Sequence, residues 1–189
     1  MDEQRILIAR VRDIAPADDA DGADAAFRTQ IEASLALGYR LSAVILGDLS
    51  DAEDATHDAV EHAWRSRHQL RASDRFDAWF HRIVVNACRD RVRRRRSRPL
   101  LLTISTSAED VRSLSATPGD AYAQAVERDA LNRALDRINV DQRIVIALRF
   151  YLDLEIDEIA RRIGVPAGTV KSRLHRGLKE LRHVWGAFQ

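Results

Sequence analysis

A run of basic and hydroxyl side chains near the C-terminus has the composition of a DNA-binding surface. Over residues 167–185, apolar residues recur every three or four positions, at Val170, Leu174, Leu178, Leu181 and Trp185. This period predicts a helix with one buried face. The opposite face carries Lys171, Ser172, Arg173, Arg176, Lys179 and Arg182. Guanidinium, ammonium and hydroxyl groups donate hydrogen bonds to phosphate oxygens and guanine edges. We therefore expect this helix to contact duplex DNA.

The segment before this helix predicts a helix-turn-helix. Ile156, Ile159 and Ile163 fall on one stripe of a short helix over residues 156–163. Gly164 then allows a tight turn without strain at a Cβ atom, and Pro166 suits the first turn of the next helix. This combination is typical of DNA-reading domains. The alternative is a plain helical hairpin whose cations are only solvated.

A second cluster combines aromatic and arginine side chains in one predicted helix. Residues 76–95 have a broad apolar face, and the segment ends in a dense arginine run. The residues are Phe76, Trp79, Phe80, Ile83, Val84, Arg89, Arg91, Arg93, Arg94, Arg95, Arg96 and Arg98. Rings can stack on unpaired bases while cations bind the phosphates, and the Asn86 amide could bond a base edge. Alternatively the rings are core, the arginines are an electrostatic patch without sequence specificity, and Asn86 is a surface amide.

The elements that must position these clusters are all predicted to be helical. Expected helices cover residues 26–46, 51–68 and 76–95 in a first domain, and residues 121–138, 142–152, 156–163 and 167–185 in a second. The expected organisation is an acidic arm (1–26), a first helical domain (27–96), a flexible linker (97–122) and a second domain (123–189) that holds the helix-turn-helix. The expected fold class is all-α.

Charge is segregated along the chain although the net charge is only +1. Residues 1–62 hold 5 basic and 14 acidic residues, whereas residues 63–98 hold 12 basic and 3 acidic. Screening by salt limits the electrostatic influence of each patch to roughly 10 Å, so DNA binding by a local patch is compatible with near-neutral net charge.

The lone Cys88 excludes an intramolecular disulfide and favours a reducing, cytoplasmic setting. No signal peptide or membrane insertion, cofactor or metal is expected.

The order of the motifs resembles a known family. The motifs are Leu46-Gly47-Asp48, Asp51-Ala52-Glu53-Asp54, Ala63-Trp64, Phe76-x-x-Trp79-Phe80-x-Arg82-Ile83-x-x-Asn86-x-x-x-Asp90 and Gly168-Thr169-Val170-Lys171-Ser172-Arg173-Leu174-x-Arg176-Gly177. Their order and spacing over most of residues 27–182 are similar to the extracytoplasmic-function (ECF) sigma factors of the sigma-70 family. One motif alone would be weaker, since the last also occurs near other helix-turn-helix regulators.

The resemblance implies an alternative sigma factor, in which the first domain is region 2 and the second is region 4. Its partners would be bacterial core RNA polymerase, promoter DNA and an anti-sigma factor. It would not be an enzyme. The positions that match polymerase-docking residues are Asp51, Asp54, His57 and Trp64. Those that match the reader of the melted −10 element are Arg75, Phe76, Trp79, Arg82, Asn86, Arg89, Arg93 and Arg94. Those that match the reader of the duplex −35 element are Thr169, Lys171, Ser172, Arg173 and Arg176.

Some positions on the predicted polymerase-docking helix depart from the family pattern. His57-Asp58 stands where Gln and Glu are usual, and Val60 replaces a large aromatic residue, which affects the expected docking contacts.

A stand-alone helix-turn-helix regulator would use the same C-terminal helix, but it would not need the aromatic and arginine cluster. Residues 57–62 contain His57 and His62, one residue too far apart for a known metalloprotease motif. A metalloenzyme is therefore disfavoured.

Overall fold

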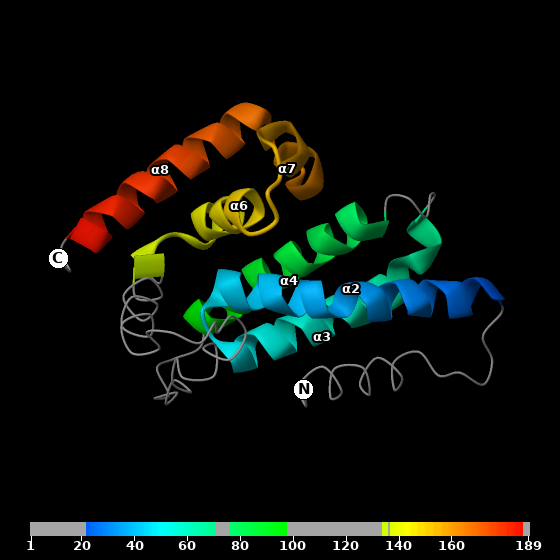
Figure 1. Cartoon of the computed structure of the whole chain (residues 1–189). Helices are drawn as coiled ribbons and strands as arrows, with labels where there is room; N and C mark the ends of the chain where they lie inside the picture. Colours follow the sequence, from blue (N-terminus) through cyan, green and yellow to red (C-terminus); the bar gives the residue numbers. More distant parts are fainter. Residues whose placement is uncertain (1–21, 71–75, 98–133, 136, 187–189) are drawn as a thin grey trace, which may run out of the picture.

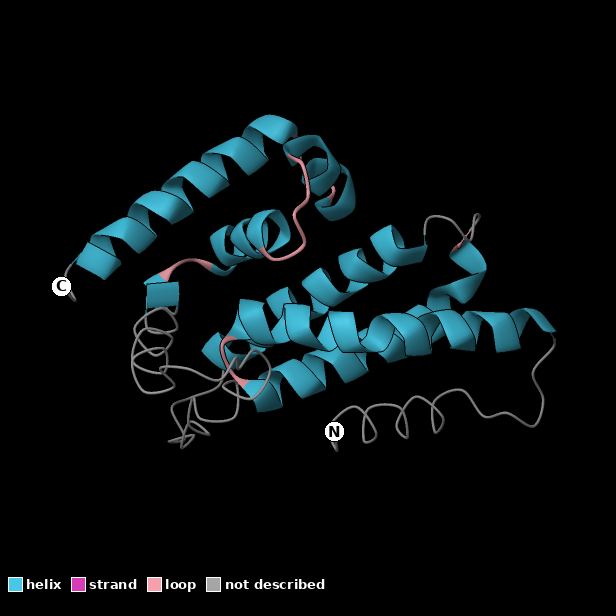
Figure 2. Cartoon of the chain, in the orientation of Figure 1, coloured by secondary structure: helices cyan, strands magenta, loops and turns pink. Residues whose placement is uncertain are grey.

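The structure is a computed structural model that describes residues 22–70, 76–97, 134–135 and 137–186. Side chains are placed for these residues except 96, 97 and 184–186. The described part of the chain is helical, with short connecting turns and no strand (Figure 2). This confirms the all-α prediction. No helix of the described residues is long and apolar enough to cross a membrane.

Three helices and a short 3-10 turn form the first unit. They are α2 (Gly22–Leu46), α3 (Leu49–Ser66), η1 (Arg67–Gln69) and α4 (Phe76–Ser97), and each of the three long helices packs against the other two. Asp48 caps α3, because its side chain accepts a hydrogen bond from the Asp51 amide at 2.8 Å. The core is built around Ile31, Leu35, Phe80 and other fully buried side chains.

The second unit consists of α6 (Val140–Phe150), α7 (Ile156–Ile163) and α8 (Ala167–Gly186). Asn139 and Gln142 form a reciprocal capping box at the start of α6. At the end of α7, Gly164 adopts φ +69°, a conformation that L side chains rarely adopt. The chain therefore turns sharply there, and α8 packs back against both α6 and α7.

The two units pack against each other. In Figure 1, α6, α7 and α8 lie above the α2–α3–α4 bundle. Helix α6 contacts α2 and α4, and α7 contacts α4. Buried apolar side chains of α6 and α7, among them Ile144, Leu148 and Ile159, belong to the same hydrophobic cluster as those of the first unit. We call this contact the interdomain seam.

The helix bounds follow the predictions to within two residues, except at the start of α2; α3 and α6 each lie two residues before their predicted ranges. The bounds of α7 match the predicted 156–163, and α4 begins at the predicted residue 76. Helix α2 begins at Gly22, four residues inside the segment predicted as an acidic arm. One reason is Asp24, which the first turn of α2 places within bonding distance of Arg67. The rest of the arm, the linker (apart from the edge at residue 97) and most of the helix predicted at 121–138 lie outside the described residues.

Candidate nucleic-acid interface

Helix α8 presents a polar face directed away from the core of its domain. Val170 is fully buried, whereas Lys171, Ser172 and Arg176 are exposed. The turn that precedes the helix is fixed by the Gly164 and Val165 amides, which both donate to the Ala160 carbonyl. The amphipathic pattern predicted this division correctly up to Leu181, and the side chain of Trp185 lies outside the description.

Two of the residues predicted to read the −35 element, Thr169 and Arg173, are less exposed than the other three. Thr169 is half-buried, and its carbonyl accepts a hydrogen bond from the Ser172 hydroxyl at 3.0 Å. Arg173 is also half-buried, and its Nη2 donates to Asp141 Oδ2 at 3.0 Å. Its Nη1 is buried and has no hydrogen-bond partner in the described part of the chain. Lys171, Ser172 and Arg176 are thus exposed, whereas Thr169 and Arg173 are half-buried.

The aromatic residues of α4 belong to a ring cluster that joins the first three helices. Phe76 is only 4% exposed. The ring of Phe27 on α2 contacts Phe76 at a centroid distance of 5.5 Å and Trp79 at 6.0 Å. It is also 6.0 Å from the ring of Trp64 on α3. Edge-to-face and tilted pairs of this kind stabilise a core. The structure therefore gives Phe76 a packing role, while Trp79 remains half-exposed.

The exposed face of α4 carries the polar residues predicted to read the −10 element. Arg82 and Asn86 are exposed. The Arg89 guanidinium joins two neighbours, since its Nη1 donates to Asn86 Oδ1 at 3.0 Å and its Nε donates to Asp141 Oδ1 at 2.8 Å. Arg82 lies against the helix-turn-helix turn, where a Cβ added to Gly164 would be 3.2 Å from its Nη2. Arg75 lies outside the described residues.

Part of the arginine run of α4 binds the acidic face of α3. Arg91 is within 2.7 Å of Asp51 and 2.6 Å of Asp54, and Arg95 is 3.3 Å from Asp51. Asp51 is accordingly only 17% exposed. The family resemblance predicted a docking role for Asp51 and Asp54, and Arg91 was expected only as one cation of the phosphate-binding arginine run. A spacing of 40 residues between partners leaves no local pattern from which this pairing could be read.

Farther along α4, the remaining predicted DNA-contacting arginines are exposed but paired. Arg94 is 3.0 Å from Asp58 of α3, and Arg93 is 2.9 Å from Asp90 on its own helix. Exposed pairs of this kind contribute little stability, ~0–1 kcal/mol each. The pairs therefore hold Arg93 and Arg94 only weakly.

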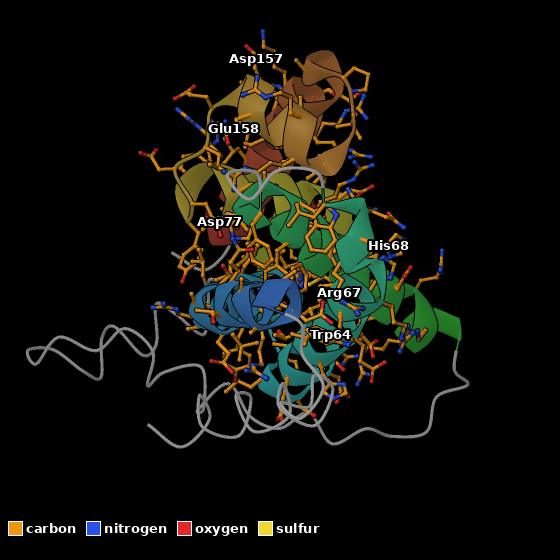
Figure 3. All side chains as sticks on the ribbon, turned by 90° about the vertical axis from the view of Figure 1, so that its right-hand side faces the viewer. Trp64, Arg67, His68, Asp77, Asp157 and Glu158 are labelled. Atoms are coloured by element: carbon orange, nitrogen blue, oxygen red, sulfur yellow. The ribbon has the colours of Figure 1, made fainter. Side chains whose placement is uncertain are left out.

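The other predicted docking residues occupy the middle and end of α3. His57 Nδ1 is 3.6 Å from Glu61, which also pairs with Arg65. Trp64 is half-buried, and the Arg67 guanidinium lies 4.6 Å above its ring. Trp64 and Arg67 are side by side in Figure 3.

Arg67 also ties η1 to α2. It donates two hydrogen bonds to Asp24, at 2.7 and 3.0 Å. These hydrogen bonds lower the pKa of Asp24 and raise the pKa of Arg67. The start of α2 is therefore held against the end of α3 by the charged form of both groups.

A buried histidine lies in the interdomain seam and was missed by the sequence analysis. His81 of α4 is 3% exposed, and its Nδ1 is 2.7 Å from Nη1 of Arg162 on α7. Because an arginine can only donate, Nδ1 must accept and the ring is neutral. Burial, together with the nearby Arg162 charge, lowers the pKa of His81 to about 4, although Asp77 acts in the opposite direction. Arg162 in turn is fixed by Glu158 at 2.7 Å.

The described residues contain no group of three or more His, Cys, Asp or Glu side chains that could hold a metal ion. What the arrangement offers instead is hydrogen-bond donors and cations on two helices, α4 and α8, together with an acidic helix, α3. Donors and cations of this kind can bind polyanions, and an acidic helix can bind a basic surface of a partner protein.

Family models match both units of the chain. Residues 31–98 match the model described as "Sigma-70 region 2", and residues 128–181 match "Sigma-70, region 4". The first match covers α2 from residue 31 and all of α3, η1 and α4, and the second includes α6, α7 and most of α8. The two helical units therefore correspond to two different regions of one family.

Named relatives and solved structures agree with this match. The ECF RNA polymerase sigma factor SigM of Mycobacterium tuberculosis is 36% identical over 148 residues, which are 78% of this chain and 71% of that protein. SigW of Bacillus subtilis is 27% identical over 76% of this chain and 80% of its own length.

The fold is similar to RpoE of Bartonella quintana, solved with the anti-sigma factor NepR, with a TM-score of 0.62 and 19% identity over 87% of this chain and 99% of that one. It is also similar to CnrH in complex with the cytosolic domain of CnrY, with a TM-score of 0.60 and 22% identity over 98% of this chain and 99% of that one. At these identities the likeness concerns the fold. Together with the region 2 and region 4 matches and the 36% identity to SigM, it leads to one conclusion: the chain belongs to the ECF RNA polymerase sigma factors of the sigma-70 family.

Proposed function

We propose that this protein binds bacterial core RNA polymerase as an alternative sigma factor and directs it to promoters, with residues 27–96 acting as region 2 and residues 123–189 as region 4. It acts in the cytoplasm by binding and has no catalytic turnover of its own. The observation that carries this proposal is the pairing of two sigma-70 regions with two separate helices, α4 and α8, that each expose donors for nucleic acid.

Helix α8 reads the −35 element as duplex. The exposed Lys171, Ser172 and Arg176 and the half-buried Thr169 supply donors for phosphates and base edges, and Arg173 joins them once it leaves Asp141. Helix α8 follows a tight glycine turn and is the second helix of the helix-turn-helix, which in such domains enters the major groove as the recognition helix.

Helix α4 captures the melted −10 element. Asn86 and Arg82 supply exposed polar contacts, and the half-exposed Trp79 supplies a ring face for an unpaired base. Phe76 supports this surface from the core, and Arg89, Arg93 and Arg94 bind the backbone phosphates. Binding the separated strand in preference to duplex shifts the promoter toward the open state by that difference in affinity.

Helix α3 docks on the polymerase. Asp54 is 47% exposed and His57 is 30% exposed, so both are accessible although both have intramolecular neighbours. An anti-sigma factor holds the protein inactive, an assignment supported by the similar fold of RpoE, which was solved in complex with the anti-sigma factor NepR.

The test is promoter-dependent RNA synthesis with core polymerase on genomic DNA, with and without the protein. Discrete start sites that require the protein are expected. Arg176→Ala and Asn86→Ala should each lower initiation about tenfold, because each loses a polar contact worth about 1–3 kcal/mol. Arg40→Ala removes an exposed cation from α2 and serves as the matched control. If no initiation appears while the protein still shifts duplex DNA specifically, a stand-alone regulator becomes the better account.

A further inference from the structure

One carboxylate in the interdomain seam binds an arginine from each DNA-reading helix. Asp141 lies in the first turn of α6. Its Oδ1 accepts from Arg89 of α4 at 2.8 Å, and its Oδ2 accepts from Arg173 of α8 at 3.0 Å. The three side chains are 25–33% exposed, so the cluster is partly screened from solvent. Pairs in such a setting are stronger than those on an open surface.

The hydrogen bonds to Asp141 occupy guanidinium groups of Arg89 and Arg173 that are proposed to bind DNA. A phosphate that approached Arg89 or Arg173 in this arrangement would meet the Asp141 carboxylate, which repels it. The Arg89 guanidinium also engages the oxygen of Asn86, the amide assigned to the −10 element. The closed arrangement therefore weakens both readers at once.

Geometry adds a second restriction. The centres of the −10 and −35 elements are about 25 base pairs apart, or ~85 Å on a straight duplex at ~3.4 Å per base pair. Arg89 and Arg173 share a single carboxylate, so the two readers lie side by side. A closed chain can engage at most one element of a promoter.

The interdomain seam contains buried polar atoms whose hydrogen bonds are not satisfied, which favours separation of the two units. Arg173 Nη1 and His81 Nε2 are both buried without a hydrogen-bond partner in the described structure. An unsatisfied buried donor favours the hydrated state. Opening would return both groups to water, which offsets part of the loss of apolar contacts.

We propose that Asp141 is a latch that holds region 4 on region 2 and keeps the free sigma factor in a form with weak affinity for DNA. The inference rests on the proposed assignment of α4 and α8 to the two promoter elements. When the latch opens, Arg89 and Arg173 are released together.

The first experiment measures the distance between the domains in the full chain without polymerase or DNA. Fluorophores on Arg65→Cys of α3 and Lys179→Cys of α8 report this distance by energy transfer, since both sites are exposed. The buried Cys88, whose pKa burial raises to about 12, stays unlabelled in the folded protein. Asp141→Asn and Arg89→Met should both increase the distance. Asp157→Asn removes the same charge from α7, at the end away from the first unit (Figure 3), and should leave the distance unchanged.

The second experiment measures binding of a fluorescein-labelled 20-base-pair duplex of mixed sequence by anisotropy. Asp141→Asn should bind about tenfold more tightly than the parent, because the apparent Kd scales with the inverse of the open fraction. Asp157→Asn should change the affinity less than twofold. Arg89→Met removes a proposed phosphate donor as well as a latch contact, so this variant is used for the distance measurement and not for DNA binding.

An unchanged distance in both Asp141→Asn and Arg89→Met, with circular dichroism of the folded protein, would overturn the latch. If the domains of Asp141→Asn separate but DNA binding is no tighter than in the parent, the inhibitory role of the latch would be overturned. Neither readout involves polymerase. A chain that opens as expected but supports no polymerase-dependent initiation would refute the proposed function and leave the latch in place.

Discussion

Protonation of His81 should weaken the packing between α4 and α7. The neutral ring accepts a hydrogen bond from Arg162 through Nδ1, and a proton on that atom would face the guanidinium donors. The pKa of His81 is lowered from 6.5 to about 4, so the native state binds fewer protons than the unfolded state between these values. Stability should therefore be intact near pH 7 and should fall as the pH drops below 6.5.

The magnitude follows from the two pKa values. Full protonation costs ~3 kcal/mol at ~1.4 kcal/mol per pKa unit, and about 2 kcal/mol of this cost is already present at pH 5. At pH 5 the paired carboxylates Asp24 and Glu158, whose pKa values are lowered by hydrogen bonds from Arg67 and Arg162, are still charged. The pH 5 measurement therefore isolates the histidine from those two ion pairs.

The assay is urea unfolding at pH 7 and pH 5 for the parent and His81→Asn. The Asn oxygen can accept from Arg162 but does not titrate, so the variant should be less stable at pH 7 because it fills less volume. It should nevertheless lose about 2 kcal/mol less than the parent between pH 7 and pH 5. The other described histidines are the same in both proteins. Equal losses in parent and variant would refute the buried, neutral assignment of His81.

Three further substitutions test the packing and capping. Gly177→Ala should lower the melting temperature, since the added Cβ would be 2.9 Å from Ile146 Cδ1, and overpacking of about 1–3 kcal/mol exceeds the helix-propensity gain of up to ~1 kcal/mol; Gly168→Ala, with no atom within 4 Å, should raise it. Phe27→Ala should cost ~3–5 kcal/mol in urea unfolding, because the ring contacts three others from α3 and α4, and a loss below 1 kcal/mol would contradict the ring cluster. Asp48→Ala should cost ~1 kcal/mol through loss of the α3 cap, and Asp48→Asn should retain most of that stability.

Most helices could be predicted because their signals are local. The stripe Ile156, Ile159 and Ile163 followed by Gly164 fixes both ends of α7, and the predicted and observed bounds coincide. The exposed face of α8 was predicted for the same reason. The start of α2 was misplaced because its first turn depends on Arg67, a partner 43 residues away.

The interdomain seam could not be predicted from the pattern. His81 and Asp141 are polar residues at helix positions that a local pattern assigns to solvent, and they are buried or half-buried because another domain packs on them. For Phe76, two indications from the sequence conflict. Its spacing indicated a core residue and its motif indicated a DNA contact, and only the ring cluster with Phe27 shows how tightly it is packed.

The acidic and basic segments of the sequence lie next to each other in the folded protein at the end of α4. The acidic face of α3 binds the arginine run, so Asp51, Asp54 and Asp58 neutralise Arg91, Arg94 and Arg95 within one surface. Under the proposed assignment, α3 binds polymerase and α4 binds the promoter strand. A polymerase surface that pairs with these carboxylates would necessarily free arginines for phosphates, whereas an intact set of pairs reduces the cationic charge that DNA meets. Docking and DNA binding by region 2 are thus coupled through the same ion pairs, and the coupling should weaken at high salt.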